Sequence, residues 1–206
     1  MIRTAWPALL AAFFIVLSIW SAIEPASREV WIAEVIPVFA VFFLLVVTYP
    51  KFRFSNTAYT LMSLWLFLHT IGAHYTFAEV PFDWFNQLIG SERNQFDRVA
   101  HYIIGFYAFA MAEFLYRKGH AGKYLASLFG LFFIMSVAAG YEIIEWLYAD
   151  IEGGEAGIEF LGSQGDIWDA QKDMLADTLG AITSLLLFLW LQRGKPARLD
   201  PDVARG

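Results

Sequence analysis

The strongly polar residues inside the hydrophobic segments of this 206-residue chain gather near one end of those segments. Carboxylates and imidazoles can move protons or hold metal ions. An ionisable group in hydrocarbon costs about 3 kcal/mol on insertion scales, so such groups usually face the interior of a bundle and indicate a functional site. The candidates are His69, His74, Asp97, His101, Glu142, Glu145, Asp173 and Asp177.

Asp97 and His101 are four residues apart, so they share one face of a helix. Gly105, Ala108 and Ala112 continue along that face, and small residues allow a neighbouring helix to come close. We therefore expect the pair to point into a bundle. Asp97 could polarise His101 as a general base or a metal ligand. The alternative is a buried hydrogen bond that only holds two helices together.

Glu142 and Glu145 are three residues apart and are also neighbours on a helix surface. Two carboxylates this close repel each other unless a proton or a cation lies between them. They are therefore candidates for a metal site or for a proton-sharing acid/base pair. The alternative for Glu145 is contact with interfacial water beside Trp146 and Tyr148. Glu142, one turn deeper, is the stronger candidate.

Asp169, Asp173 and Asp177 form a ladder that leads into the last hydrophobic segment. Acids near a helix N-terminus also gain from the helix dipole, so Asp169 or Asp173 could serve only that purpose. Lys172 and Arg98 are the basic residues adjacent to these acids. They could bind an anionic headgroup, but the many surrounding carboxylates favour structural pairing.

His69 and His74 lie about 140° apart around a helix, so they cannot both face one point. We favour His69 as a substrate contact, together with Arg98 and Lys172. Glu34 lies at a similar height, and the alternative for it is an interfacial position. The candidate catalytic residues are Asp97, His101, Glu142, Glu145, Asp173 and Asp177. The candidate ligands of a divalent metal ion are His101, Glu142, Asp173 and Asp177.

These residues are carried by hydrophobic segments, because the chain is 58% hydrophobic against roughly 45–50% in soluble domains. A bilayer core of about 30 Å needs roughly 20 apolar residues per helix. Six segments qualify: Trp6–Ile23, Trp31–Tyr49, Ala58–Phe77, Phe96–Tyr116, Tyr124–Tyr148 and Asp173–Leu191. We predict an all-α, polytopic membrane helix bundle of about six transmembrane helices, with residues 1–192 as the transmembrane domain and 193–206 as a polar cytoplasmic tail. The first segment could instead be a signal peptide, although its long apolar core favours retention.

Basic residues predict the orientation of the bundle. Ten of the 14 Lys and Arg residues lie at the N-terminus, in the second and fourth loops and at the C-terminus. The other four are Arg28, Arg93, Arg98 and Lys172. Cytoplasmic loops carry the excess of positive charge. Both termini are therefore predicted to be cytoplasmic (N-in/C-in), and the polar residues extracytoplasmic.

Two extracytoplasmic segments between the predicted helices have distinct compositions. Residues 150–169 are acidic and rich in glycine, which favours a solvated loop. The alternatives are a lid over the site and a calcium-binding loop, although the spacing does not fit an EF-hand. Residues 79–94 contain Trp84 and Phe85, which is typical of a short amphipathic piece lying on the membrane interface.

Several functions lose support. The net charge of −6 argues against nucleic acid as a partner, because binding phosphates needs clustered Lys and Arg. The absence of cysteine excludes disulfides and thiolate metal sites. No Gly-rich phosphate loop, Gly-x-Ser-x-Gly elbow or His-Glu-x-x-His pair is present, which argues against nucleotide hydrolysis and serine proteolysis.

Residues 96–106, 141–146 and 165–180 resemble the YjdF-type family of bacterial inner-membrane proteins over most of the chain. The last three segments also resemble, more distantly, the VanZ-like membrane proteins linked to glycopeptide resistance, although Asp177 stands where an Asn is expected there. The resemblance implies a multi-pass protein of the bacterial inner (plasma) membrane and carries over no catalytic residues.

Two classes of function remain open. The first is a metal- or acid/base-dependent enzyme that acts on a lipid or lipid-linked substrate at an extracytoplasmic site. The second is a non-enzymatic structural or accessory membrane protein whose polar network stabilises the bundle. Ion or proton transport is the weakest hypothesis, because the inner half of the bundle is nearly bare of ionisable groups.

Overall fold

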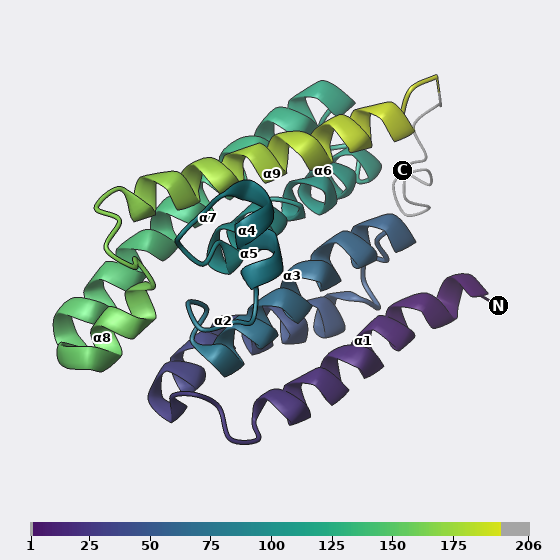
Figure 1. Ribbon diagram of the computed structural model, residues 1–206. Helices are drawn as coiled ribbons and strands as arrows, with labels where there is room; N and C mark the ends of the chain where they lie inside the picture. The colour runs from purple at the N-terminus through teal and green to yellow at the C-terminus, as the bar shows by residue number, and fades with distance from the viewer. Residues whose placement is uncertain (1, 195–206) are drawn as a thin grey trace.

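The computed structural model describes residues 2–194, and within that range it is entirely helical, without strands (Figure 1). The predicted polar tail therefore lies outside the described residues from position 195 onward. The helices are α1 (Ile2–Ser21), α2 (Arg28–Thr48), α3 (Asn56–Tyr75), α4 (Asp83–Ile89), α5 (Phe96–Ile104), α6 (Tyr107–Arg117), α7 (Lys123–Glu152), α8 (Gly154–Leu161) and α9 (Asp169–Leu191).

Each predicted hydrophobic segment corresponds to one helix, or to the α5–α6 pair. By length and composition, four segments of the described chain could cross a membrane: Arg28–Thr48, Phe96–Arg117, Lys123–Glu152 and Asp169–Leu191. The apolar part of α1 is shorter, Ala5–Ser21. The all-helical membrane fold is thus confirmed, and the count of six crossings stays a prediction.

Helix α3 is the central helix, since it packs against α1, α2, α5 and α6. Half of its 20 residues are buried, among them Ser63, His69 and Thr70. Its polar content is tolerated because these side chains contact protein rather than lipid. The outer helices show the reverse pattern: α2 exposes Ile36, Phe43 and other large apolar side chains, as a lipid-facing surface would.

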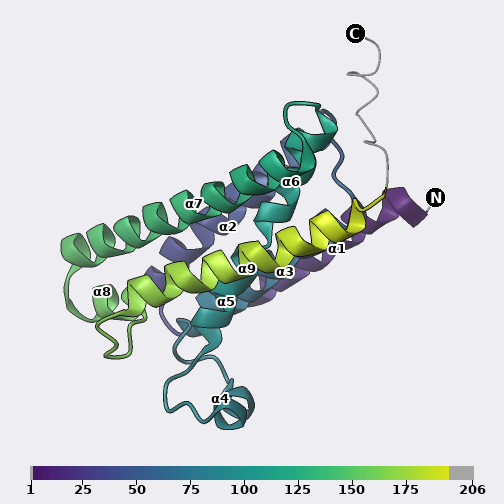
Figure 2. The ribbon, with the colours of Figure 1, turned by 90° about the horizontal axis from the view of Figure 1, so that it is seen from above.

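One end of the bundle is closed by packing. Figures 1 and 2 place the start of α1 and the end of α9 at this same end. Glu113, only 3% exposed, accepts hydrogen bonds there from the backbone N–H and the hydroxyl of Ser55 and from Arg117. Next to it, apolar side chains such as Met62, Phe109 and Phe188 form the largest core cluster.

The opposite end carries the connections that surround the polar residues. Helix α8 folds back along the end of α7 after a turn at Gly153 and Gly154, whose φ angles are 63° and 59°. Helix α4 projects from the bundle (Figure 2) and exposes Trp84, Leu88 and Ile89. The segment predicted to be an amphipathic interfacial piece therefore contains a helix with an exposed apolar face.

Candidate functional site

The site begins where α5 crosses α9. A Cβ built on Gly180 would overlap the carbonyl oxygen of Tyr102, and one on Gly105 would overlap the carbonyl oxygen of Asp177. The two backbones are therefore in direct contact, as expected when small residues line a helix interface. His101 lies one turn before Gly105, so this contact brings its ring against Asp177.

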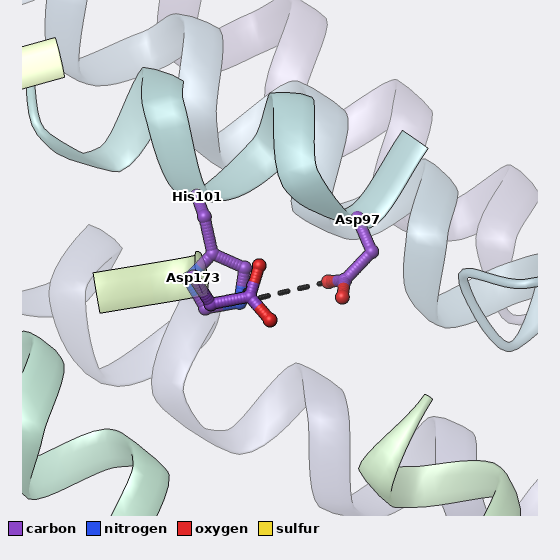
Figure 3. Close-up of side chains that lie close together, drawn as sticks. All are labelled: Asp97, His101 and Asp173. Carbon is purple, nitrogen blue, oxygen red and sulfur yellow. Dashed lines mark ion pairs between the residues drawn. The ribbon is translucent and has the colours of Figure 1, made fainter. Parts of the chain in front are cut away.

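His101 has carboxylates around both of its ring nitrogens. Its Nδ1 lies 3.3 Å from Oδ2 of Asp177. Its Nε2 lies 3.6 Å from Oδ1 of Asp97 and 3.9 Å from Oδ1 of Asp173. Figure 3 shows Asp97, His101 and Asp173 converging from two helices. The predicted Asp97–His101 pair thus points into the bundle, toward two of the three aspartates of the ladder.

Two arginines join this group to its surroundings. Arg98 Nη1 lies 2.5 Å from Oδ1 of Asp173, and Arg98 Nη2 donates to Oδ1 of Asp169 at 2.7 Å. Arg93 Nη1 lies 2.5 Å from the same oxygen of Asp169, and Arg93 Nη2 lies 3.7 Å from Oδ2 of Asp97. Arg98 is therefore paired with aspartates of the protein, which is the structural role that the sequence favoured for it. Asp169 makes two ion pairs in addition to its position in the first turn of α9.

Lys172 turns away from the cluster. It is half-exposed and donates to Oδ2 of Asp166 at 2.6 Å. This contact, together with the backbone N–H of Trp168, holds the pKa of the Asp166 carboxyl below its usual value. Burial lowers the pKa of Arg93, but its hydrogen bond to Asp169 and the nearby aspartates outweigh that effect and raise it.

A second polar group faces the first from α2, α3 and α7. His69 Nε2 lies 2.9 Å from Oε2 of Glu34, and Tyr141 donates to the same oxygen at 3.3 Å. Glu34 is only 3% exposed, so the interfacial alternative is wrong: its carboxylate contacts the His69 imidazole inside the bundle. His74 contacts the backbone oxygen of Ser21 instead, as expected for two histidines on different faces.

Both groups line one cavity of about 50 Å³. Its polar lining comes from Glu34, His69, Asp97, His101, Tyr141, Glu145 and Asp177. A volume of this size holds an ion or one or two water molecules. Of the predicted catalytic residues, Asp97, His101, Glu145 and Asp177 line the cavity. Asp173 contacts His101 from beside it, and Glu142 is outside the lining.

Helix α8 forms part of the cavity wall. Phe160 and Leu161 line the cavity, and the Phe160 ring lies 4.2 Å from that of Tyr148. The sequence favoured a solvated loop between positions 150 and 169. Helix α8, within this segment, instead covers one side of the cavity, as the alternative of a lid predicted.

Three buried carboxylate oxygens in and beside the cluster make no hydrogen bond in the described part of the chain. Oδ1 of Asp173, Oδ1 of Asp177 and Oε1 of Glu142 are buried and have no hydrogen-bond partner. Among the described residues, the side chains that could hold a metal ion are Asp97, His101 and Asp173, whose donor atoms all lie within 4.8 Å of one another. Of the predicted metal ligands, His101 and Asp173 are in this group. Asp177 contacts the other ring nitrogen of His101, and Glu142 is not in the group.

The family described as Predicted membrane protein (DUF2238) matches residues 6–194. The chain belongs to this family. It is also 32% identical over 192 residues to the inner membrane protein YjdF of Escherichia coli (strain K12), a match that covers 90% of this chain and 91% of the relative. No solved structure matches the chain.

The YjdF-type resemblance is thus confirmed. The chain is a multi-pass protein of the bacterial inner membrane and lies in the lipid bilayer. The matched residues include all three segments on which the resemblance rested. The more distant likeness to VanZ-like proteins stays a prediction.

Sequence reasoning missed two residues of the site, Arg93 and Tyr141, and left the role of Glu34 open. Arg93 lies in the loop before α5, so helix spacing gave no signal for its contact with Asp97. Glu34 is an acid inside an apolar segment, which by itself indicates a buried partner. Tyr141 gave no comparable signal, because a tyrosine near a helix end is equally typical of the membrane interface.

Proposed function

We propose that this chain is an inner-membrane enzyme that acts from the extracytoplasmic side on a lipid or lipid-linked substrate. His101 and its carboxylates form the reacting centre, through acid/base chemistry or through a bound metal ion. The observation that carries the proposal is the His101 imidazole, which has carboxylates around both ring nitrogens at the wall of a buried cavity. A network that serves stability alone gains little from oxygens that lack partners.

The two sides of the cavity suggest complementary roles. Asp177 at Nδ1 orients the His101 ring, while Asp97 and Asp173 lie near Nε2, where proton transfer or metal binding would take place. Glu145 adds a carboxyl group to the cavity wall, which suits it to exchange a proton with substrate. His69 presents a second imidazole and remains our candidate for a substrate contact.

Access from the bilayer supports a lipid substrate. Val137 lines the cavity and is 40% exposed, so the cavity wall reaches the outer surface of α7 at this point. Val137 lies about 21 Å along the helix from Lys123, well inside the apolar part of α7. On this side of the cavity, α2 and α7 are joined by α8, which packs against both helices. The hydrogen bond from Tyr141 to Glu34 also connects them.

The cavity volume limits what can enter. About 50 Å³ is too small for a lipid headgroup, so the scissile bond would meet His101 at the mouth of the cavity. Helix α8 would move to admit more of the substrate, because Gly153 and Gly154 join it to α7 and have open space around them. Lys172 and Arg98 are our other candidates for headgroup contacts. Each would first have to give up a contact with an aspartate before it could bind a phosphate oxygen of the headgroup.

The proposed topology has six crossings with both termini cytoplasmic, residues 1–192 as the membrane domain and 193–206 as a cytoplasmic tail. Arg53 and Arg117 support it, since the Arg117 side chain donates to the backbone oxygen of Arg53 and so joins two basic loops at one end of the bundle. The cavity lies toward the other end. A reporter fused within residues 150–166 should score as extracytoplasmic, and a cytoplasmic score would overturn the orientation.

The competing function is a purely structural network. The observation in its favour is the pair of arginines, because Arg93 and Arg98 tie α5 to the start of α9 through Asp169. Replacing His101 separates the two functions, since the arginine–aspartate pairs do not need it. Transport remains the weakest hypothesis, because Glu113 is held by Ser55 and Arg117 at the closed end.

The test compares His101→Gln with His74→Gln, a control at a similar height whose ring contacts Ser21 and Trp20 outside the cavity. Membranes from cells producing each variant, the wild type or no protein are analysed by mass spectrometry for lipids and lipid-linked intermediates. We expect species that change with the wild type and with His74→Gln but not with His101→Gln. Equal profiles for the wild type and for a folded His101→Gln variant would contradict an enzymatic role.

A further inference from the structure

The three side chains in Figure 3 have the donor types and spacing of a metal site. Asp97, His101 and Asp173 each offer one donor atom, and these atoms all lie within 4.8 Å of one another. Nε2 of His101 is 3.6 Å from Oδ1 of Asp97 and 3.9 Å from Oδ1 of Asp173. These separations are too long for hydrogen bonds but match the spacing of donors around a cation at about 2.0–2.2 Å from each.

The second observation is a buried carboxylate oxygen of Asp177, next to His101, that has no partner among the described residues. Asp173 is 3% exposed and Asp177 1% exposed, yet Oδ1 of each has no hydrogen-bond partner. Oδ1 of Asp173 is ion-paired with Arg98 Nη1 at 2.5 Å, whereas Oδ1 of Asp177 has neither a hydrogen bond nor an ion pair within residues 2–194. A buried carboxylate oxygen without a partner is costly, and buried charges in proteins are either paired or bound to metal ions.

Asp177 contributes through the opposite edge of the His101 ring. Its Oδ2 lies 3.3 Å from Nδ1, so a proton on Nδ1 points to a carboxylate. The lone pair of Nε2 is then free to bind a metal ion. Histidine ligands of metal ions commonly have such a carboxylate behind them, which fixes the tautomer and raises the basicity of the ring. The ring is therefore oriented to bind a metal ion at Nε2.

The charge balance agrees with a divalent ion. The network contains five aspartates, namely Asp97, Asp166, Asp169, Asp173 and Asp177. Its cations are Arg93, Arg98 and Lys172. With His101 neutral, two negative charges remain uncompensated in a largely buried cluster. One divalent cation would neutralise them.

We propose that Asp97, His101 and Asp173 bind one divalent transition-metal ion, with Asp177 as the outer carboxylate that orients His101. Two oxygens and one imidazole suit Zn²⁺, Mn²⁺ or Fe²⁺ better than Ca²⁺ or Mg²⁺, which prefer oxygen ligands alone. Three protein ligands leave a coordination position open, as in catalytic rather than structural zinc sites. Because Asp97 and His101 line the cavity, that position would be reached from it.

This inference rests on the proposed function for what the metal ion does: it would activate a water molecule or polarise a substrate oxygen. Binding itself is measured without an activity. Purified full-length protein in detergent is stripped with a chelator and titrated with Zn²⁺ by calorimetry. A parallel titration with Co²⁺ is followed by its visible absorption, which reports the coordination of the bound ion.

The variants are chosen to separate ligation from general acidity. His101→Gln and Asp173→Asn each remove a ligand with little change in volume, and Asp177→Asn removes only the outer carboxylate. Asp166→Asn is the matched control, because it removes one aspartate charge from the same network but contacts Lys172 rather than His101. Size-exclusion profiles and helical circular dichroism identify variants that fail to fold.

We expect one equivalent of Zn²⁺ in the wild type and in Asp166→Asn, no binding in His101→Gln or Asp173→Asn, and a 10–100-fold weaker Kd in Asp177→Asn. Absence of binding in folded wild type would overturn the metal site, as would equal binding in all variants. Even if the ligand variants misfold, Co²⁺ spectra of the wild type test the site directly: a spectrum without an imidazole-bound, low-coordinate ion would overturn it.

The outcomes for metal and function are distinguishable. A metal-free wild type whose lipid profile still depends on His101 would overturn the metal ion and leave an acid/base enzyme. Stoichiometric metal in a protein whose lipid profile is indifferent to His101 would support the site and overturn the enzymatic proposal.

Discussion

The crossing of α5 and α9 predicts an unusual response to a one-carbon change at Gly180. In Gly180→Ala the new Cβ would overlap the carbonyl oxygen of Tyr102. That oxygen belongs to a helix backbone, so it can move only with the whole of α5. We expect the two helices to separate by at least ~1 Å, which would take the 3.3 Å contact between His101 and Asp177 beyond hydrogen-bonding distance.

The magnitude follows from two opposing terms. Overpacking a close contact costs about 1–3 kcal/mol, and a backbone overlap belongs at the upper end of that range. Replacing a helical glycine with alanine returns about 1 kcal/mol of helix propensity. The net loss at Gly180 is therefore about 2 kcal/mol. Gly140, in α7, has open space where a Cβ would lie, with nothing within 4 Å, so Gly140→Ala should keep the propensity gain of about 1 kcal/mol.

The assay is thermal unfolding of both variants in one detergent, followed by tryptophan fluorescence. The same substitution at the two glycines should separate the free energies of unfolding by about 3 kcal/mol, or about 6–12 °C in Tm for a chain of this length. Zn²⁺ binding should weaken in Gly180→Ala and stay unchanged in Gly140→Ala. Equal Tm values for the two variants would refute the reasoning that backbone contact positions His101 against Asp177.

Two further predictions concern charged groups outside the cavity. Glu113→Gln removes the charge that Ser55 and Arg117 contact, so the free energy of unfolding should fall by about 1.5–3 kcal/mol while Zn²⁺ binding is retained; an unchanged Tm would contradict this role. The Lys172 ammonium lowers the pKa of Asp166, so the stabilisation from this pair is present above about pH 4, the ordinary Asp value, and is lost as pH falls through the lower folded-state pKa. Acid unfolding of Asp166→Asn should therefore differ from wild type in losing this pH dependence, and identical curves below pH 4 would show that the pair adds nothing.

The sequence predicts which residues share a helix face or a depth in the membrane better than it predicts which side chains are in contact. Spacing within one helix was sufficient to place Asp97 with His101. Hydropathy placed Asp173 and Asp177 at the same level as that pair, and the helices indeed bring them together. Both inferences depend only on helix geometry and on the cost of burying charge.

The rest depends on how each helix is rotated and on how its loops return. Glu142 was the stronger candidate of the glutamate pair because it is one turn deeper, yet only Glu145 lines the cavity. The pairing of Glu34 with His69 requires α2 and α3 to face each other at one height, which no local pattern specifies. Arg93 reaches the site from a loop, where it contacts Asp169. Lys172, although it is in α9, lies outside the site because it contacts Asp166 instead. Such choices are decided by packing across the whole bundle.

The closed end of the bundle has a consequence for bioenergetics. Between the cavity and Glu113 lies a packed apolar cluster that includes Met62, Phe109 and Phe188, and Glu113 itself is engaged by its neighbours. With the topology proposed above, a proton released or taken up in the cavity exchanges with the periplasm, because this cluster separates the cavity from Glu113 in the described part of the chain. The charge state of the site would then follow periplasmic pH, and the chemistry could turn over without dissipating the proton gradient across the inner membrane.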